Sequence, residues 1–517
     1  MKFHWLDITT LITYLLLLVS MGIYFSRRNT NTENYFVGSR SYSGWVIGLS
    51  MIGTSISSVT FLAYPGDSFK TSWLRFLPNL MLPVVIITTA YFFLPFFRRN
   101  NIISAYEYLE DRFGPSVRVY GAVTFFIGQL VRISLILYLL SLMVNEVTNL
   151  SVIQSILLAG IIVGLYTIIG GIEAVIWTDV IQTFTLLSGG IICLGVIIHQ
   201  LPGGFSQIID VAIANNKLTF SELKNGILQP VPWGISLANK TGIMMLLLGL
   251  SWFFQEYVTN QNMIQRYASA KNTQEARKAM YISSINIPIW AFFMFLGTAL
   301  YVFFQVFPTN AAAEMLDGTQ KAEDILPYFI MQNLPHGVAG MIIAAAIAAA
   351  MSSLDSSINA MATVGVHDIY RRHWVKDRDD KHYLHVAWCL ATAITIAMII
   401  GAYILTQTQT KTLQDTYNTV GSVVMGGVLG LYLLGFSTRR GSAKSVWFAI
   451  VLTVLFTSWT VLAKQGFLPT WLHVPFDLYY TGIIGQIVMF AGIFTAAFLL
   501  SERKKPLTNL TLWTQGK

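Results

Sequence analysis

Residues 341–363 read MIIAAAIAAAMSSLDSSINAMAT, an apolar helix-forming run interrupted by four serines and one aspartate. A segment of this length can cross a membrane, because about 20 apolar residues span the hydrocarbon core. A carboxylate at that depth costs roughly 2.5–3.5 kcal/mol on insertion scales. Ser352, Asp355 and Ser356 are three and four residues apart, so they share one helical face. We interpret this face as a site for a hard monovalent cation; hydroxyls that bond back to their own helix are the alternative.

The composition of the whole chain indicates a membrane protein. Of its 517 residues, 54% are hydrophobic and 11% are charged, whereas soluble domains carry about 25% charged residues. No cleavage motif follows the first apolar segment, so we expect no removable secretion signal. The two cysteines lie in apolar segments and predict neither disulfides nor thiol chemistry.

Thirteen apolar segments are long enough to be predicted as membrane-spanning helices. They lie near 5–26, 42–64, 73–97, 119–147, 152–170, 175–199, 236–260, 280–306, 336–367, 384–406, 416–436, 443–464 and 478–500. We therefore predict an all-α membrane protein in which residues 1–505 form a single transmembrane domain. Residues 506–517 are expected to be a short, disordered cytoplasmic tail.

Lysine and arginine in the loops predict the orientation of the chain in the membrane. With the N-terminus outside, most of the 33 Lys and Arg residues fall in cytoplasmic loops, among them Arg266 and the charge run 371–383. We therefore interpret the net charge of +8 as a topology signal and expect no nucleic-acid partner. The long loops 201–235 and 307–335 are then outside, where we expect them to carry short helices.

Two of the predicted spans contain features of broken helices. Span 42–64 contains Gly48, Gly53 and six hydroxyl residues from Ser50 to Thr60, and span 236–260 ends in polar residues up to Asn260. Polar, interrupted segments at matching places in two halves of a transporter indicate a binding site near the bilayer midplane. We predict two five-helix repeats of opposite orientation, 42–199 and 236–436, with an extra first helix (5–26) and two C-terminal helices (443–500).

The first broken span offers a cluster of candidate ligands, Gly53, Ser55, Ile56, Ser57 and Thr60. An unwound helix frees backbone carbonyls, which can coordinate a cation or accept hydrogen bonds from a solute. Close helix packing through small residues is the alternative. Because the hydroxyls occur on successive residues, and packing needs only one face, we favour binding.

Charged residues inside other spans add to the candidate site. Arg132 lies near the middle of its span, and a buried guanidinium favours a bidentate carboxylate from either a protein acid or a solute. Asp179 can approach the same cation as Asp355, with an ion pair to Arg132 as the alternative. Two close carboxyls raise one another's pKa, so protonation is also open. Asn79 is a weaker candidate.

Motifs for catalysis are missing from the sequence. It contains no HExxH, Walker A or GxSxG motif and no Cys/His spacing typical of zinc sites. We therefore predict that the protein is not an enzyme.

Three stretches of this chain resemble the sodium:solute symporter family. They are YFVGSRSYSGWVIGLSMIGTSISSVTF (35–61), YTIIGGIEAVIWTDVIQ (166–182) and AAAIAAAMSSLDSSINAMATVGVHDIY (344–370). The resemblance covers nearly the whole chain and implies the leucine-transporter-type fold, with five-plus-five inverted repeats and flanking helices. Within the family the chain is most similar to bacterial sialic acid symporters.

This resemblance also implies roles for individual residues. A shared sodium site would use the carbonyls of Gly53, Ile56 and Ala349 with the hydroxyls of Ser352 and Ser353. A second sodium would be held at Asp179, Ser352, Asp355 and Ser356, although this chain has an acid at Asp355 where those relatives have a serine. The solute pocket would comprise Ser55, Ser57, Thr60, Asn79 and Arg132, with the arginine pairing a solute carboxylate.

We therefore expect a symporter in the bacterial inner membrane, with its C-terminus cytoplasmic, that couples one or two sodium ions to uptake of a small, carboxylated solute such as sialic acid. A neutral sugar, another sugar acid or a monocarboxylate is the alternative substrate. A transporter-like solute sensor is the alternative function. The expected partners are the solute, sodium ions and membrane lipids.

Overall fold

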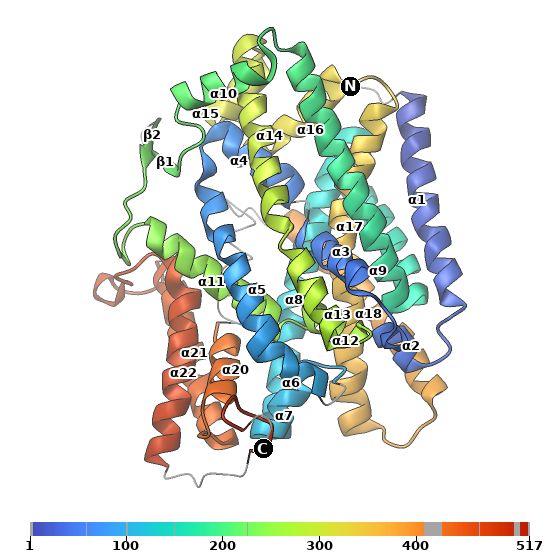
Figure 1. The fold of residues 1–517 in the computed structure, drawn as a ribbon, viewed down its shortest axis with the longest axis vertical. Helices are drawn as coiled ribbons and strands as arrows, with labels where there is room; N and C mark the ends of the chain where they lie inside the picture. Colours follow the sequence, from blue (N-terminus) through green and yellow to red (C-terminus); the bar gives the residue numbers. More distant parts are fainter. Residues whose placement is uncertain are drawn as a thin grey trace.

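The computed structural model describes residues 4–57, 59–99, 102–148, 150–224, 226–407, 426–464, 466–500 and 507–514. Long helices run along one axis of the molecule (Figure 1). The N-terminus, α10, α15 and α16 lie at one end of this bundle, and α6, α7 and the C-terminus lie at the other. Helices suit a membrane because each satisfies its own backbone hydrogen bonds.

Among the described residues, nine long helices form the body of the bundle. They are α1 (Trp5–Ser26), α8 (Pro115–Thr148), α9 (Val152–Gln200), α11 (Gly242–Thr259), α14 (Asn286–Val306), α17 (Val338–Val364), α18 (Asp380–Gln407), α21 (Ala443–Lys464) and α22 (Thr481–Leu499). A tenth crossing is made of consecutive pieces: a 3₁₀ segment (Trp73–Met81), α5 (Leu82–Thr88), a π-helical segment (Thr89–Phe93) and α6 (Leu94–Arg99).

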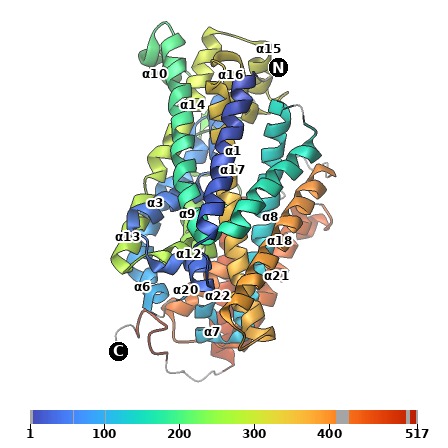
Figure 2. The same ribbon diagram turned by 90° about the vertical axis from the view of Figure 1, so that its right-hand side faces the viewer.

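Helix α17 lies at the centre of the molecule. Every residue from Ile342 to Val364 is buried, and a π-helical segment (Gly365–Trp374) continues the helix towards the C-terminal end. Helices α1, α8, α9 and α18 all pack against it, and Figure 2 shows α1 on the outside of this group. The serines and the aspartate of the opening sequence are therefore enclosed by protein on all sides.

The first predicted break is present in the structure. Helix α3 (Gly44–Ser55) ends before Ile56, which is extended (φ −91°, ψ 118°). A π-helical segment (Val59–Ala63) and α4 (Tyr64–Lys70) follow, and the chain bends by 64° between the two halves. The break frees carbonyl groups in the middle of the bundle.

The second predicted break lies at Asn260. This residue is extended (φ −85°, ψ 123°) between α11 and α12 (Gln261–Ser269). All nine residues of α12 are buried, so this polar segment runs through the protein interior. Helix α13 (Thr273–Ser283) follows and packs against α3.

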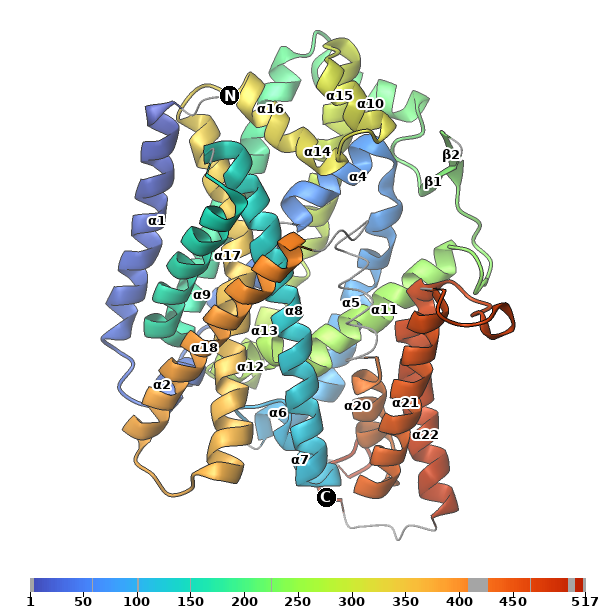
Figure 3. The same ribbon diagram turned by 180° about the vertical axis from the view of Figure 1, so that it is seen from behind.

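Helix α9 folds back on itself. Gly171 interrupts it with φ 60° and ψ −163°, a conformation that favours glycine. The hydroxyls of Tyr166 and Thr178 lie within hydrogen-bond distance of the same oxygen of Asp355, although 12 residues of straight helix would separate them by about 18 Å. The chain must therefore turn back at Gly171, so that both limbs reach Asp355; Figure 3 shows α9 between α1 and α17.

Short elements connect the long helices. They are α2 (Thr32–Val37), a 3₁₀ turn (Gly38–Arg40), α7 (Glu107–Phe113), α10 (Gly204–Ala214), β1 (Ser221–Lys224), β2 (Ile227–Pro230), α15 (Asn310–Asp317), a 3₁₀ turn (Ala322–Asp324), α16 (Ile325–Asn333), α20 (Val428–Ser437) and 3₁₀ turns at Thr470–Leu472 and Leu478–Tyr480. Strands β1 and β2 pair antiparallel. Loop 201–235 therefore carries a hairpin as well as the expected short helix.

The number of membrane-crossing helices differs from the predicted thirteen. Ten helices among the described residues are long and apolar enough to span a membrane, or eleven if the bent α3–α4 pair is one span. Part of the difference is α9, which is counted once although its two limbs, on either side of Gly171, correspond to the predicted spans 152–170 and 175–199. The predicted span 416–436 begins outside the described residues, and only α20 represents it.

The expectation of a disordered tail is wrong for residues 507–514. Leu507 and Thr511 are buried, and the amide of Leu512 donates to the carbonyl of Phe436 at the end of α20. Tyr108 of α7 also donates to the carbonyl of Leu510 (3.0 Å). Residues 507–514 are ordered because they donate to carbonyls at the end of α20 and accept a hydrogen bond from α7.

Candidate functional site

The first part of the candidate site lies where α17 meets the end of α3. The hydroxyl of Ser352 donates to the carbonyl of Gly53 (3.0 Å) and to that of Ala349 (3.1 Å). The hydroxyl of Ser353 is buried and has no hydrogen-bond partner among the described residues. Ile56 marks the end of α3. The two sequence segments with the predicted first-site ligands are thus in direct contact.

Gly53 permits the close packing of α3 on α9. A Cβ atom at this position would lie 2.8 Å from the Thr183 hydroxyl and 2.9 Å from the Asp179 carbonyl, which is closer than side-chain atoms pack. Glycine is therefore required here by the space between the helices. It also brings Asp179 close to the first part of the site.

The second part of the site is a buried ion pair. Arg266 of α12 donates from Nη2 to Asp179 Oδ2 (2.7 Å), and both side chains are fully buried. The same guanidinium donates to the hydroxyls of Ser356 (2.7 Å) and Ser50 (2.9 Å). It therefore connects α12, α9, α17 and α3.

Asp355 lies next to this pair and has its own set of donors. Tyr166 donates to Asp355 Oδ2 (2.8 Å), and Thr178 is 3.3 Å from the same oxygen. The other oxygen accepts from the amide of Ser356 (2.5 Å). Donors from both limbs of α9 thus hold this carboxyl in place.

The charges of this cluster do not cancel. With both carboxyls ionised, Asp179 and Asp355 carry two negative charges against the single positive charge of Arg266. Oδ1 of Asp179 is buried without a hydrogen-bond partner among the described residues. The cluster therefore has a net charge of −1, which one monovalent cation would balance. In the described part of the chain no three His, Cys, Asp or Glu side chains gather to hold a metal ion.

The placement of Arg266 in a cytoplasmic loop, predicted from the sequence, is wrong. Its side chain is fully buried, because the break at Asn260 directs α12 through the core. The structure also gives Asp179 a partner other than Arg132, the alternative that the sequence left open. A signal was available: Arg266 is the single charge in NQNMIQRYAS (260–269), a segment too poor in charge for a solvated loop.

The residues predicted for the solute lie mainly around the first break. Ser55 is half-buried and donates to the carbonyl of Met51 (2.8 Å), and Thr60 is buried. Ser57 lies in the non-helical stretch between α3 and α4. Asn79 is buried and donates to the hydroxyl of Tyr64 at the start of α4 (3.0 Å). Asn79 is thereby connected to the segment that carries the three hydroxyl residues.

Arg132 is half-buried in the middle of α8. Within the described residues it takes part in none of the observed ion pairs. One turn earlier, the side-chain oxygen of Gln129 accepts from Ser357 of α17 (3.0 Å), so this stretch of α8 lies close to the ion-pair cluster. No described contact joins Arg132 to Ser55, Thr60 or Asn79.

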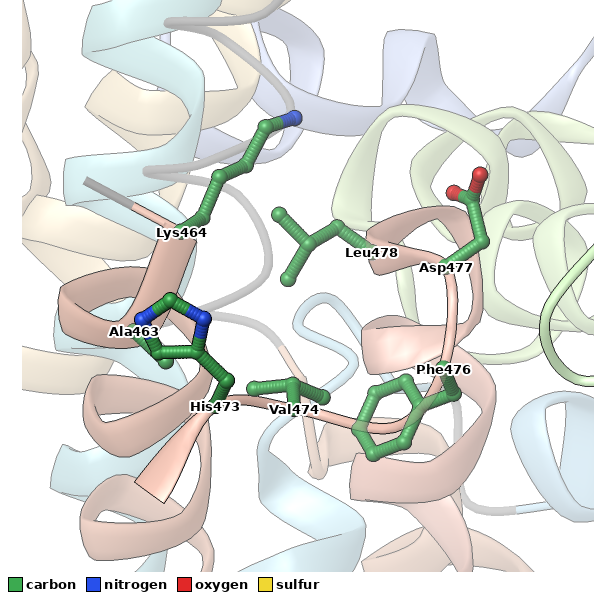
Figure 4. A pocket seen from close by; sticks show the side chains of 7 residues that line it. All are labelled: Ala463, Lys464, His473, Val474, Phe476, Asp477 and Leu478. Carbon is green, nitrogen blue, oxygen red and sulfur yellow. The ribbon is translucent and has the colours of Figure 1, made fainter. Parts of the chain in front are cut away.

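A cavity of about 340 Å³ lies elsewhere, between the end of α21 and the segment before α22. Figure 4 shows its lining, which is Ala463, Lys464, His473, Val474, Phe476, Asp477 and Leu478. None of the residues predicted to bind ions or solute lines it. We therefore do not assign the solute site to this cavity.

Comparison with known proteins gives a consistent result. The model of the sodium:solute symporter family matches residues 35–451. The sodium/sialic acid symporter NanT of Aliivibrio fischeri is 29% identical over 502 residues, which are 96% of this chain and 94% of that protein. The sodium/sialic acid symporter SiaT of Proteus mirabilis is 29% identical over 510 residues, 98% of each chain.

Solved structures agree with these relatives. A substrate-bound, outward-open Na⁺-coupled sialic acid symporter superposes with a TM-score of 0.87 at 27% identity, covering 98% of this chain and all of that one. The nucleobase-cation-symport-1 family transporter Mhp1 superposes with a TM-score of 0.54 at 13% identity, covering 92% of this chain and 95% of that one. The fold is therefore that of the leucine-transporter type, as predicted.

Proposed function

Because this chain belongs to the sodium:solute symporter family, we propose that it is a multi-pass membrane transporter that couples sodium to the import of sialic acid or a closely similar acidic sugar. Two relatives that match it over nearly the full length are sodium/sialic acid symporters. The structural observation that carries the proposal is the contact of Ser352 with the carbonyls of Gly53 and Ala349, next to the hydroxyl of Ser353, which has no hydrogen-bond partner in the described part of the chain.

These atoms suit a sodium ion. Sodium is a hard cation that favours oxygen ligands, and carbonyls at unwound helices bind it in transporters. A buried hydroxyl without a partner costs about 1–3 kcal/mol, and a bound ion would remove this cost for Ser353. Gly53, Ile56, Ala349, Ser352 and Ser353 are the proposed ligands.

A second monovalent cation is proposed at Asp355, with Asp179 and Ser356 beside it. Arg266 already balances one of the two carboxylates, so the remaining charge is that of one cation. Both sodium and a proton have the right charge. Measurement of sodium and proton fluxes during uptake distinguishes these two ions.

The proposed solute pocket comprises Ser55, Ser57, Thr60, Asn79 and Arg132. The hydroxyls and the amide can hydrogen-bond a sugar, and Arg132 can form two parallel hydrogen bonds with its carboxylate. The absence of a described ion pair for Arg132 supports this role.

The proposed location is the bacterial inner membrane, with the N-terminus outside and the C-terminus in the cytoplasm. The distribution of Lys and Arg supports this orientation. The N-terminus and C-terminus lie at opposite ends of the bundle (Figure 1), and the proposed orientation requires this arrangement. We further propose that 42–199 and 236–436 are the two inverted repeats.

Uptake into proteoliposomes tests the function. We expect an inward sodium gradient to drive uptake of sialic acid, and potassium in place of sodium to abolish it. Glucose and a monocarboxylate complete the panel, because relatives named for these solutes are 28% and 25% identical to this chain. Uptake of sialic acid that is equal in sodium and potassium would refute the coupling.

A pair of serine variants connects this test to the site. We expect Ser353→Ala to raise the sodium concentration for half-maximal uptake about tenfold, since it removes one proposed ligand. Ser141→Ala is the matched control, because Ser141 is also buried but only donates to the carbonyl of Tyr138 in its own helix. Its sodium dependence is expected to equal that of the unmodified protein.

A further inference from the structure

The extra first helix contacts the beginning of α17 through one buried carboxylate. Asp7 of α1 is 2% exposed. Its Oδ1 accepts from the amide of Gly337 (2.6 Å) and from the amide of Gly340 (2.9 Å). Gly337 immediately precedes α17, and Gly340 is in its first turn.

This contact is a helix cap supplied by another helix. The first amides of a helix lack partners within it, and the helix dipole places partial positive charge at this end. A carboxylate at this position accepts hydrogen bonds from these amides and balances the partial positive charge. The backbone of Asp7 also packs so closely on Gly340 that a Cβ at Gly340 would collide with it, so the axial position of α17 is fixed against α1.

The environment of Asp7 adds to this attachment. The amide of His4 donates to its other oxygen (3.3 Å), and a ring nitrogen of His336 lies 3.5 Å from the same oxygen. The rings of His4 and His336 stack, with centroids 4.6 Å apart. The residues that precede α1 and α17, His4 and His336, are therefore in contact with Asp7 and with each other.

A second contact of α1 reaches the ion-pair cluster. Gly22 packs on Tyr166 so closely that a Cβ at Gly22 would lie 2.6 Å from that of Tyr166. The hydroxyl of Tyr166 donates to Asp355 (2.8 Å). Helix α1 thus contacts α17 directly at its start, and through Tyr166 in its middle.

We propose that Asp7 is a positioning residue for cation binding, which rests on the proposed function. By capping α17 it sets the position of Ala349, Ser352 and Ser353 along the helix axis relative to the carbonyls of α3. Loss of the cap lets the first turn of α17 unwind and moves these ligands away from the geometry that the ion needs. Asp7 itself does not touch the ion.

The test measures sodium dependence in proteoliposomes for Asp7→Ala and Asp7→Asn. For Asp7→Ala we expect the half-saturating sodium concentration to rise about fivefold, which corresponds to the roughly 1 kcal/mol that a helix cap contributes. The KM for the solute at saturating sodium stays within about twofold. Asp7→Asn keeps an acceptor oxygen, so a smaller rise is expected. Thr9→Ala is the control, since Thr9 is exposed and donates only to its own helix.

Hydrogen exchange of the purified protein provides a readout that does not need transport. Asp7→Ala is expected to speed exchange at residues 337–341, while α8 and α18 exchange as in the unmodified protein. If uptake by the unmodified protein did not depend on sodium, the proposed function would be refuted. Sodium-dependent uptake with the same half-saturation in Asp7→Ala, or unchanged exchange at 337–341, would overturn the positioning role of Asp7.

Discussion

Arg266 Nη2 lies 2.7 Å from Asp179 Oδ2 at the centre of the bundle, and neither side chain is accessible to solvent. The arginine comes from α12 and the aspartate from α9. A buried ion pair often contributes little net stability, because both charges lose their hydration. Removal of one partner, however, leaves the other charge buried and uncompensated.

We therefore expect Arg266→Met to lower the free energy of unfolding by about 3–5 kcal/mol. In the double variant Arg266→Met, Asp179→Asn the net charge of the cluster is the same as in the unmodified protein, because one charge of each sign is removed, so it is expected to lose less stability than the single variant. Thermal unfolding in detergent, followed by tryptophan fluorescence, measures this order. Arg27→Met is the control, because Arg27 is exposed. A double variant less stable than Arg266→Met would contradict the pair as described.

Gly53→Ala is expected to abolish transport. The added Cβ would be 2.8 Å from the Thr183 hydroxyl, so α3 must move away from α9 and take the Gly53 carbonyl with it. Sodium-driven uptake and unfolding temperature are measured together. The control is Gly195→Ala, where nothing lies within 4 Å of the new Cβ; helix propensity predicts a gain of roughly 0.5–1 kcal/mol there. Normal uptake by Gly53→Ala would show that the close approach is not needed.

Arg132→Ala is expected to weaken the binding of acidic solutes selectively. Loss of a charge-assisted hydrogen bond costs roughly 1.5–3 kcal/mol, so the Kd of sialic acid should rise at least about tenfold. Arg132→Lys keeps the charge but loses the bidentate geometry, and an intermediate Kd is expected. Thermal shifts with and without solute, in sodium, give these constants. Equal affinity of Arg132→Ala and unmodified protein for sialic acid would exclude the proposed carboxylate contact.

Because Lys217 is buried, we expect the free energy of unfolding to increase as the pH rises. Its Nζ atom is buried, donates to the carbonyls of Phe69 (2.7 Å) and Thr71 (3.0 Å), and lies 3.9 Å from the ring centroid of Tyr301. Burial lowers its pKa to about 7, against about 10.4 in an unfolded chain. Between these values the unfolded chain binds a proton that the folded protein lacks, so stability increases as pH rises from about 7 to about 10.

Unfolding temperatures at pH 7, 8 and 9 measure this contribution as a difference between variants. Lys217→Met is expected to show a smaller rise with pH than the unmodified protein. Lys321→Met serves as the control, because Lys321 is exposed. The same rise in all three proteins would rule out a deprotonated Lys217.

The fold and part of the site could be predicted from the sequence because membrane insertion constrains both. Polar residues between Ser50 and Thr60 in an apolar span predict a break, and the structure has one at Ile56. Arg266 was misplaced, since a basic residue after a span has the same pattern in a loop as in a buried segment. Only the direction of α12 after Asn260 distinguishes the two.

Distances between helices could not be predicted from the sequence either. The hydrogen bond of Tyr166 to Asp355 depends on the backbone of Gly171, which returns one limb of α9 beside the other. The pattern YTIIGGIEAVIW predicts a connection there but not its angle. Similarly, the cap that Asp7 provides for α17 joins residues 330 positions apart.

The uneven charge of the Asp179, Asp355 and Arg266 cluster has a consequence for transport under a membrane potential. With a monovalent cation bound at Asp355 the cluster is neutral, so the loaded protein can switch sides without moving its charge through the field. Without that cation, one negative charge is exposed to the field. A full crossing of 100 mV changes the energy of one charge by about 2.3 kcal/mol. Through this cluster, voltage should therefore act on the return of the empty carrier and favour the state in which the vacant Asp355 site faces the positive side.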